Sequence, residues 1–92
     1  MPRYFFDTEN GSPFHDSDGV ELADADEARL YAIRFAGQCV ATDAALLAQG
    51  EDFRVEVRND EGLLLLAVTT FVTDSPAIAR QAEAGQRSAP GN

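Results

Sequence analysis

Apolar residues recur with a helical period in the middle of the chain, between Asp24 and Gly50. Residues three and four positions apart share one side of a helix. One such stripe is expected to pack on a sheet, and it consists of Ala28, Ala32, Phe35, Cys39 and Leu46, with Tyr31 and Ala36 at its margins. Asp24 and Glu27 have the spacing of a capping box, and Gly50 suits a left-handed C-terminal cap. The pattern predicts one long helix from Asp24 to Gly50.

A second apolar stripe occupies the other side of this helix. Its members are Leu30, Ile33, Gly37, Val40, Ala44 and Leu47. One sheet covers only one side of a helix, and full burial of a large apolar side chain is worth roughly 1.5–3 kcal/mol. We therefore expect a homo-oligomer whose interface is built on Leu30, Ile33, Gly37, Val40 and Leu47. Polar residues such as Arg34 and Gln38 interrupt the apolar surface, so no membrane span is expected.

Strand patterns precede the helix. Residues 2–7 are rich in aromatic β-formers and predict a first strand. Two turn clusters, Asn10-Gly11 and Asp18-Gly19, follow it. Residues 20–22 then predict a short second strand that pairs back on the first.

Two more strands follow the helix. Phe53, Val55 and Val57 alternate with charged residues, which is typical of a strand with one buried face. Residues 59–62 predict a hairpin turn. The strand beyond it, residues 63–72, is apolar on both faces. It is therefore expected either in the centre of the sheet or covered by another subunit.

These elements predict a single α+β domain over residues 1–73, because 92 residues are too few for two cores. Its expected form is a four-stranded, mainly antiparallel sheet with the long helix across one face, in the order β-β-α-β-β. The strand order stays open. Residues 74–92 are expected to form a C-terminal tail, with a short helix at 76–84 and a disordered segment at 86–92.

The net charge of -9 is concentrated near the start of the chain. Residues 1–27 contain eight acids against one basic residue, Arg3, which gives that segment a charge of -7. The seven basic residues are scattered arginines. This distribution disfavours nucleic acid and anionic membrane as partners and suits a basic protein partner.

The single cysteine, Cys39, excludes an internal disulfide framework and indicates a reducing compartment. Its place on the core stripe favours a packing role over a nucleophilic one. The first residues lack the pattern of a signal peptide. We therefore expect a cytoplasmic protein.

The residues between His15 and Gly19 form the one cluster with metal-ligand types close together. An EF-hand alignment would place Phe14 and Ala25 at ligand positions, so that motif is excluded. Asp16 and Asp18 remain weak candidates for a hydrated divalent cation. His15 lies near serines, but all of them belong to one loop, and we expect no catalytic residue and no cofactor.

The opening M-P-R-Y-F-F-D, the segment D-G-V-E-L-A-D and the later F-R-V-E-V-R-N-D-E-G together resemble a family of small, uncharacterised bacterial proteins. That family is a domain of unknown function with a PRYFFD start, and the resemblance covers roughly residues 1–73. It implies a compact β-β-α-β-β unit and no assigned activity.

Two hypotheses of function follow. The first is a non-enzymatic, homo-oligomeric interaction or regulatory module. The alternative is a small-ligand or divalent-cation binding domain that uses the acidic loop 7–18. An enzyme ranks third, because a deep pocket needs a larger domain.

Overall fold

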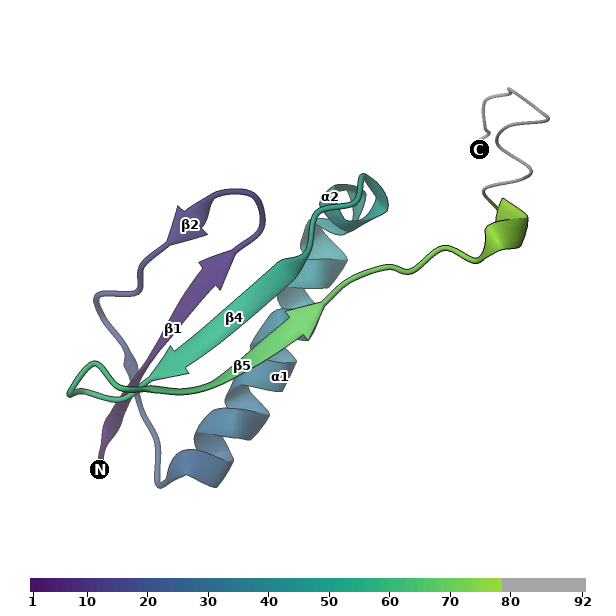
Figure 1. Ribbon diagram of the computed structural model, residues 1–92. Helices are drawn as coiled ribbons and strands as arrows, with labels where there is room; N and C mark the ends of the chain where they lie inside the picture. Colours follow the sequence, from purple (N-terminus) through teal and green to yellow (C-terminus); the bar gives the residue numbers. More distant parts are fainter. Residues whose placement is uncertain (79–92) are drawn as a thin grey trace.

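A computed structural model describes residues 1–78 as an α+β domain, in which an antiparallel sheet carries a long helix on one face (Figure 1). This confirms the predicted fold class. The elements in chain order are β1 (Arg3–Glu9), β2 (Pro13–Phe14), β3 (Val20–Glu21), α1 (Ala25–Thr42), α2 (Ala44–Ala48), β4 (Phe53–Arg58) and β5 (Leu64–Thr70).

The sheet has the order β2-β1-β4-β5, and β3 pairs with another part of β1. All pairings are antiparallel, and the central register sets Phe6 opposite Val57 and Val55 opposite Val68. The two-residue strand β2 was missed, because Pro13 and Phe14 are flanked by turn residues. The apolar strand β5 lies at one edge of the sheet, so the expectation of a central strand was wrong. The alternative expectation, that another subunit covers this strand, stays a prediction.

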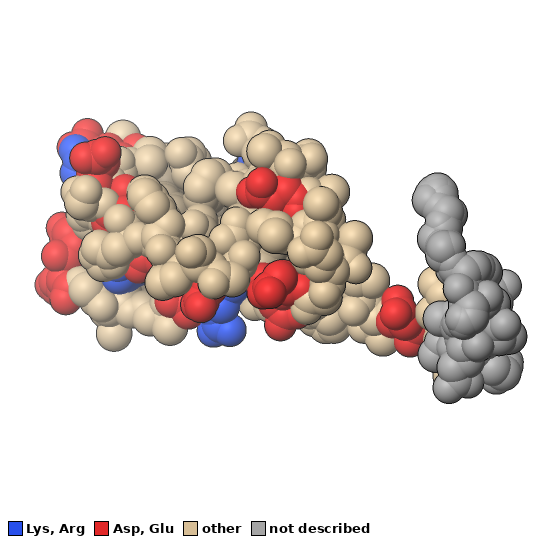
Figure 2. Space-filling model, turned by 90° about the horizontal axis from the view of Figure 1, so that it is seen from above, with Lys and Arg blue, Asp and Glu red and all other residues tan. Residues whose placement is uncertain are grey.

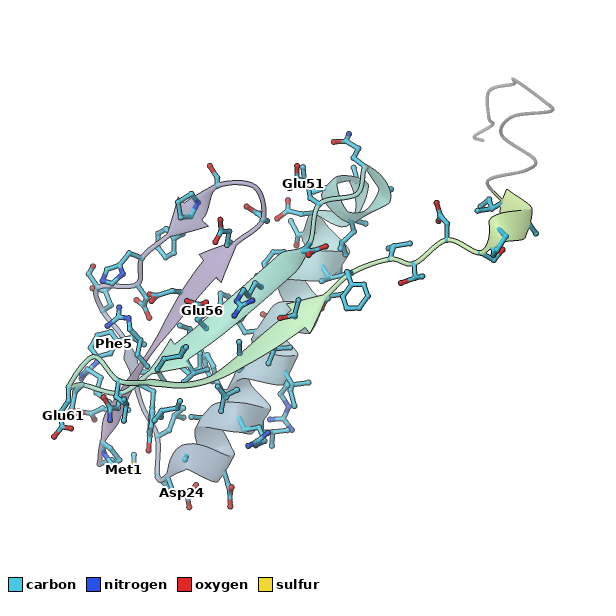
Figure 3. The ribbon with its side chains drawn as sticks, in the orientation of Figure 1. Met1, Phe5, Asp24, Glu51, Glu56 and Glu61 are labelled. Atoms are coloured by element: carbon cyan, nitrogen blue, oxygen red, sulfur yellow. The ribbon has the colours of Figure 1, made fainter. Side chains whose placement is uncertain are left out.

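Helix α1 begins as the sequence predicted. The backbone N–H of Glu27 donates to Oδ1 of Asp24 at 3.0 Å, which caps the first turn. The carboxylate of Glu27 accepts the N–H of Ala23 at 3.2 Å, one residue before the position used in a standard capping box. Figure 3 shows Asp24 at the same end of the domain as Met1.

The helix does not run unbroken to Gly50, so the prediction of one long helix was wrong. The Thr42 hydroxyl donates to the carbonyl of Gln38 at 3.0 Å, and Asp43 leaves the helical region with φ -111° and ψ 37°. Ser, Thr and Asp side chains compete with helical hydrogen bonds in this way. Gly50, with φ 99°, then ends α2 as predicted. The N–H groups of Gly50 and Glu51 close the helix end on the carbonyls of Leu47 and Leu46.

The core lies between α1 and the sheet. Its buried members are Tyr4, Phe6, Ala28, Ala32, Ala36, Leu47, Phe53, Val55 and Val57. Three alanines therefore form the centre of the helix contact, which lets α1 approach the strands closely. Phe35 and Cys39 were predicted at the centre but are half-buried beside it. Burial raises the pKa of the Cys39 thiol, and the carboxylate of Asp43 acts in the same direction.

The predicted C-terminal helix begins where expected. Residues 76–78 are helical, and Oγ of Ser75 accepts the N–H of Ala77 at 3.2 Å. The rest of the predicted helix at 76–84 and the segment 86–92 lie outside the described residues. Within residues 1–78, no helix has the length and apolar character to cross a membrane.

Candidate functional site

The acidic loop runs from β1 to β3 along the β1 edge of the sheet. Asn10 and Gly11 turn the chain into β2, and residues 15–19 then lead to β3. Gly19 has φ 72°, and a Cβ at this position would lie only 2.8–2.9 Å from atoms of Arg3, Tyr4 and Phe5. Glycine is required here, because the loop returns directly against β1.

Asp16 anchors this loop to the sheet. Its Oδ1 accepts the backbone N–H groups of Asp18 at 3.0 Å and Gly19 at 3.1 Å, and its Oδ2 accepts that of Phe6 at 3.1 Å. Phe6 lies between the part of β1 that pairs with β3 and the part that pairs with β2, so Asp16 supplies an acceptor where no strand does. Burial opposes ionisation of Asp16, but the three hydrogen bonds outweigh it and lower its pKa.

Asp7 and Arg58 join β1 to β4 beside this anchor. Nε of Arg58 donates to Oδ2 of Asp7 at 2.7 Å, and Nη2 donates to Oδ1 at 3.1 Å. Oδ1 also accepts the N–H of Asp16 at 2.9 Å. The hydrogen bonds from Arg58 hold the pKa of Asp7 below its ordinary value, and Asp7 in turn raises the pKa of Arg58. A two-pronged pair of this kind is stronger and better ordered than an ordinary surface ion pair.

The guanidinium of Arg58 makes three further contacts on the face of the sheet away from α1. Nη2 donates to the carbonyl oxygen of Asp16 at 2.9 Å and lies 3.0 Å from Nε2 of His15. Its carbon lies 4.9 Å from the centre of the Phe5 ring, a cation-π contact. Figure 3 shows Phe5 on this face together with Glu56. Arg58 thus connects two strands and the loop.

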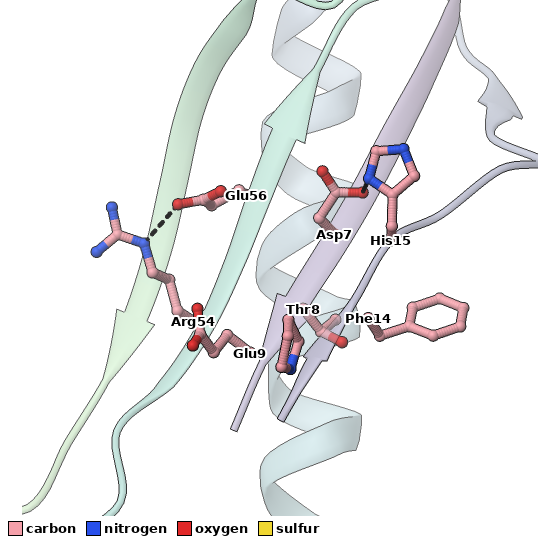
Figure 4. A pocket seen from close by; sticks show the side chains of 8 residues that line it. Asp7, Thr8, Glu9, Phe14, His15, Arg54 and Glu56 are labelled. Atoms are coloured by element: carbon pink, nitrogen blue, oxygen red, sulfur yellow. Dashed lines mark hydrogen bonds and ion pairs between the residues drawn. The ribbon is translucent and has the colours of Figure 1, made fainter. Parts of the chain in front are cut away.

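A shallow hollow of about 350 Å³ adjoins this cluster on the same face (Figure 4). Its charged lining residues are Asp7, Glu9, Arg54 and Glu56, His15 lies beside them, and Phe14 and Pro13 of β2 form one side. Nε of Arg54 donates to Glu56 at 2.9 Å, while the His15 side chain is 73% exposed. The hollow is open to solvent. Within it Arg54 pairs with Glu56, while Asp7 pairs with Arg58 beside it.

The structure places the two weak candidates for cation binding differently. Both carboxylate oxygens of Asp16 already accept backbone hydrogen bonds, whereas Asp18 is exposed and its carbonyl accepts Nη1 of Arg3 at 2.8 Å. Among residues 1–78, no group of three His, Cys, Asp or Glu side chains is placed to hold a metal ion. Nε2 of His15 lies 3.0 Å from Nη2 of Arg58, and its Nδ1 lies 3.5 Å from Oδ1 of Asp7.

A sequence profile described as a domain of unknown function, DUF6894, matches residues 3–72. The chain belongs to the DUF6894 family. No curated protein and no solved structure matches it. The matched segment begins at the first residue of β1 and ends two residues beyond β5, so this DUF6894 domain includes strands β1 to β5 and helices α1 and α2.

The residues expected at the oligomer interface of the DUF6894 domain have different environments. Leu30 and Ile33 are 46% and 51% exposed, and a Cβ on Gly37 would meet nothing within 4 Å. Val40 is half-buried against the core, and Leu47 is buried. The placement of Leu47 on the outer stripe was therefore wrong, because the break at Asp43 turns α2 so that Leu47 faces the sheet.

The free edge of the DUF6894 sheet exposes large apolar side chains. The most exposed along β5 and its two ends are Leu63, Leu64, Phe71 and Val72, each between 53% and 62% exposed. Beyond Thr70 the chain runs away from the sheet (Figure 1). Figure 2 shows one face of the molecule, on which the acidic residues form separate groups. A few basic residues lie among these groups, and wide uncharged areas separate them.

Arg58 is the residue of this site that the sequence did not single out. In the sequence, Arg58 is one of several charged residues that alternate with the buried residues of β4. Only the pairing of Phe5 with Arg58 across the sheet brings its side chain to Asp7, which is 51 residues away in sequence. The sequence offered only an indirect signal: Asp7 in β1 and Arg58 in β4 both face away from the helix.

Proposed function

We propose that this DUF6894 domain is a non-enzymatic, homo-oligomeric interaction or regulatory module. The observation that carries the proposal is β5, an edge strand that exposes apolar side chains and whose outer backbone N–H and C=O groups pair with no other strand within residues 1–78. Natural edge strands are usually short, charged, bulged or covered, because an exposed apolar edge pairs with other chains. Strand β5 is long and uncharged, and its one irregularity, a register shift at Leu65, lies near its first end, so residues 66–70 are better suited to pairing than to solvent.

The chemistry of the loop cluster supports a non-enzymatic role. A general acid that works near neutral pH needs a raised carboxyl pKa. The half-buried Asp7 and Asp16 have lowered pKa values instead, and hydrogen bonds within the fold occupy their oxygens. The cluster is therefore organised to hold the loop on the sheet.

Cellular context belongs to the same proposal. A bacterial origin rests on the resemblance of the PRYFFD start, and a cytoplasmic location rests on the single, half-buried Cys39. Both are consistent with a small acidic module whose surface excludes polyanions.

The test of the proposal is the mass in solution. Size-exclusion chromatography with light scattering, at tens of micromolar, should give at least twice the chain mass of 9.9 kDa. Leu65→Lys, which adds a charge to the exposed face of β5, should shift the mass toward 9.9 kDa. Phe14→Lys is the control, because Phe14 is also exposed, at 61% against 37% for Leu65, but lies at the opposite edge of the sheet. A monomeric wild-type chain under these conditions would refute the proposal.

A second candidate is a small-ligand or cation binding domain that uses the acidic loop 7–18. The hollow beside Phe14 favours it, because an exposed ring next to Glu9 and Glu56 suits a small organic cation. Calorimetric titration with calcium, magnesium and a primary amine tests this function. Saturable binding that Glu9→Gln abolishes would support it, and heats of dilution alone would exclude it for these probes.

A further inference from the structure

The two edges of the sheet differ sharply. At one edge, β2 has only two residues, one of them Pro13, and the acidic loop continues directly from it. Proline and charge are the usual protections against pairing with another chain. At the other edge, β5 has seven residues and neither protection. Within residues 1–78, β5 is therefore the edge that can add a further strand, along the regular part that follows the register shift at Leu65.

The charge distribution of the chain indicates which partner would pair with β5. Residues 63–73 contain no charged side chain, in a chain whose net charge is -9. Two copies of such a chain repel each other wherever their acidic surfaces meet, and the repulsion is least where neither copy carries charge. A basic partner would be drawn to the acidic loop instead. The uncharged strand β5 is therefore the part of the surface best suited to a second copy.

We propose that β5 pairs antiparallel with β5 of a second copy about a two-fold axis, so that two sheets become one continuous sheet. This inference rests on the proposed function and adds its geometry. A two-fold axis places the same surface of both copies in contact and necessarily makes the paired strands antiparallel. The helices of both copies then lie on the same side of the joined sheet.

The position of α1 makes the helix part of this interface. Helix α1 packs against β4 and β5. Strands lie about 4.8 Å apart, so pairing of β5 with its copy would bring the two helix axes to about 10–14 Å from each other. Helices with their side chains are about 10–12 Å across, which allows contact between them.

The exposed stripe on α1 faces the required direction. The Tyr31 ring lies 4.6 Å from the ring of Phe6 in β1, so this flank of the helix is directed toward β1. Ile33 and Gly37 lie on the opposite flank, which is directed toward β5 and the second copy. The open space around Gly37 admits a neighbouring helix, and Ile33 is exposed one helical turn earlier. The apolar edge and the apolar helix stripe thus form one interface.

Thiol cross-linking tests the strand pairing. In a Cys39→Ser background, single cysteines replace Leu64, Ala67 or Thr69, which face away from α1 on β5, opposite Arg58, Glu56 and Arg54. A short bifunctional thiol reagent should link copies through at least one of them at ten times or more the yield of Glu56→Cys. Glu56 is the matched control, because it lies on the same face one strand inward, opposite Ala67.

Ile33→Glu tests the helix contact, with Gln38→Glu as its control at an exposed position of the same helix. Sedimentation should show a dissociation constant raised at least tenfold for Ile33→Glu and little changed for Gln38→Glu. An oligomer whose β5 cysteines link no better than Glu56→Cys would overturn this geometry and leave the proposed function standing. An oligomer unaffected by Ile33→Glu would overturn the helix contact, and a monomeric wild-type chain would overturn the proposed function itself.

Discussion

Replacing Asp16 by alanine removes the acceptor for three backbone N–H groups at once. The donors from Asp18 and Gly19 belong to an exposed turn and can bond to water instead. The donor from Phe6 lies in the partly buried gap of β1, where an unmade hydrogen bond costs about 1–3 kcal/mol. Adding a smaller loss at the turn, we expect Asp16→Ala to lower the free energy of unfolding by about 2–4 kcal/mol.

That loss is a large part of the stability of a small domain, which is about 5–15 kcal/mol. The melting temperature should fall by about 10–25 °C at fixed protein concentration. Urea unfolding followed by circular dichroism measures the free energy, and Asp16→Asn should be intermediate because it retains one acceptor oxygen. Asp18→Ala is the matched control two residues away and should change stability by less than about 0.5 kcal/mol. An Asp16→Ala variant as stable as this control would show that Asp16 does not anchor the loop.

Three further predictions follow from the same contacts. The pKa values of Asp7 and Asp16 are lower in the folded state than in the unfolded chain, so their contribution to stability is complete above about pH 4 and is lost as the pH falls through the pKa values of the folded state. Urea midpoints unchanged between pH 5 and pH 2.5 would contradict this. Phe35 is half-buried, so Phe35→Ala should cost about 1.5–3 kcal/mol, less than the 3–5 kcal/mol expected for the buried Phe6→Ala; equal urea midpoints for these two variants would be the contrary result. Two copies that each carry a charge of -9 repel, so raising sodium chloride from about 50 mM to about 500 mM should tighten self-association several-fold in sedimentation; weaker association would indicate an interface held by ion pairs.

The sequence determined the local elements, because their causes lie within a few residues. The cap formed by Asp24 and Glu27, the buried alternation of β4, and the hairpin at residues 59–62 all appear as predicted. Asn59 illustrates the reason: its side-chain oxygen accepts the N–H groups of Glu61 and Leu63, both at 2.9 Å. A turn of this kind depends only on its own residues.

Only the tertiary structure decided what depends on pairing between distant segments. The apolar pattern of β5 predicted a central strand or a strand covered by another subunit, and the order β2-β1-β4-β5 places β5 at an edge. The contact of Asp7 with Arg58 required the register of β1 on β4. Leu47 is buried in the core because the helix breaks at Asp43. The backbone conformation of this one residue sets the direction of α2. Periodicity identifies which residues share a side of an element, whereas the packing of elements decides which side is covered.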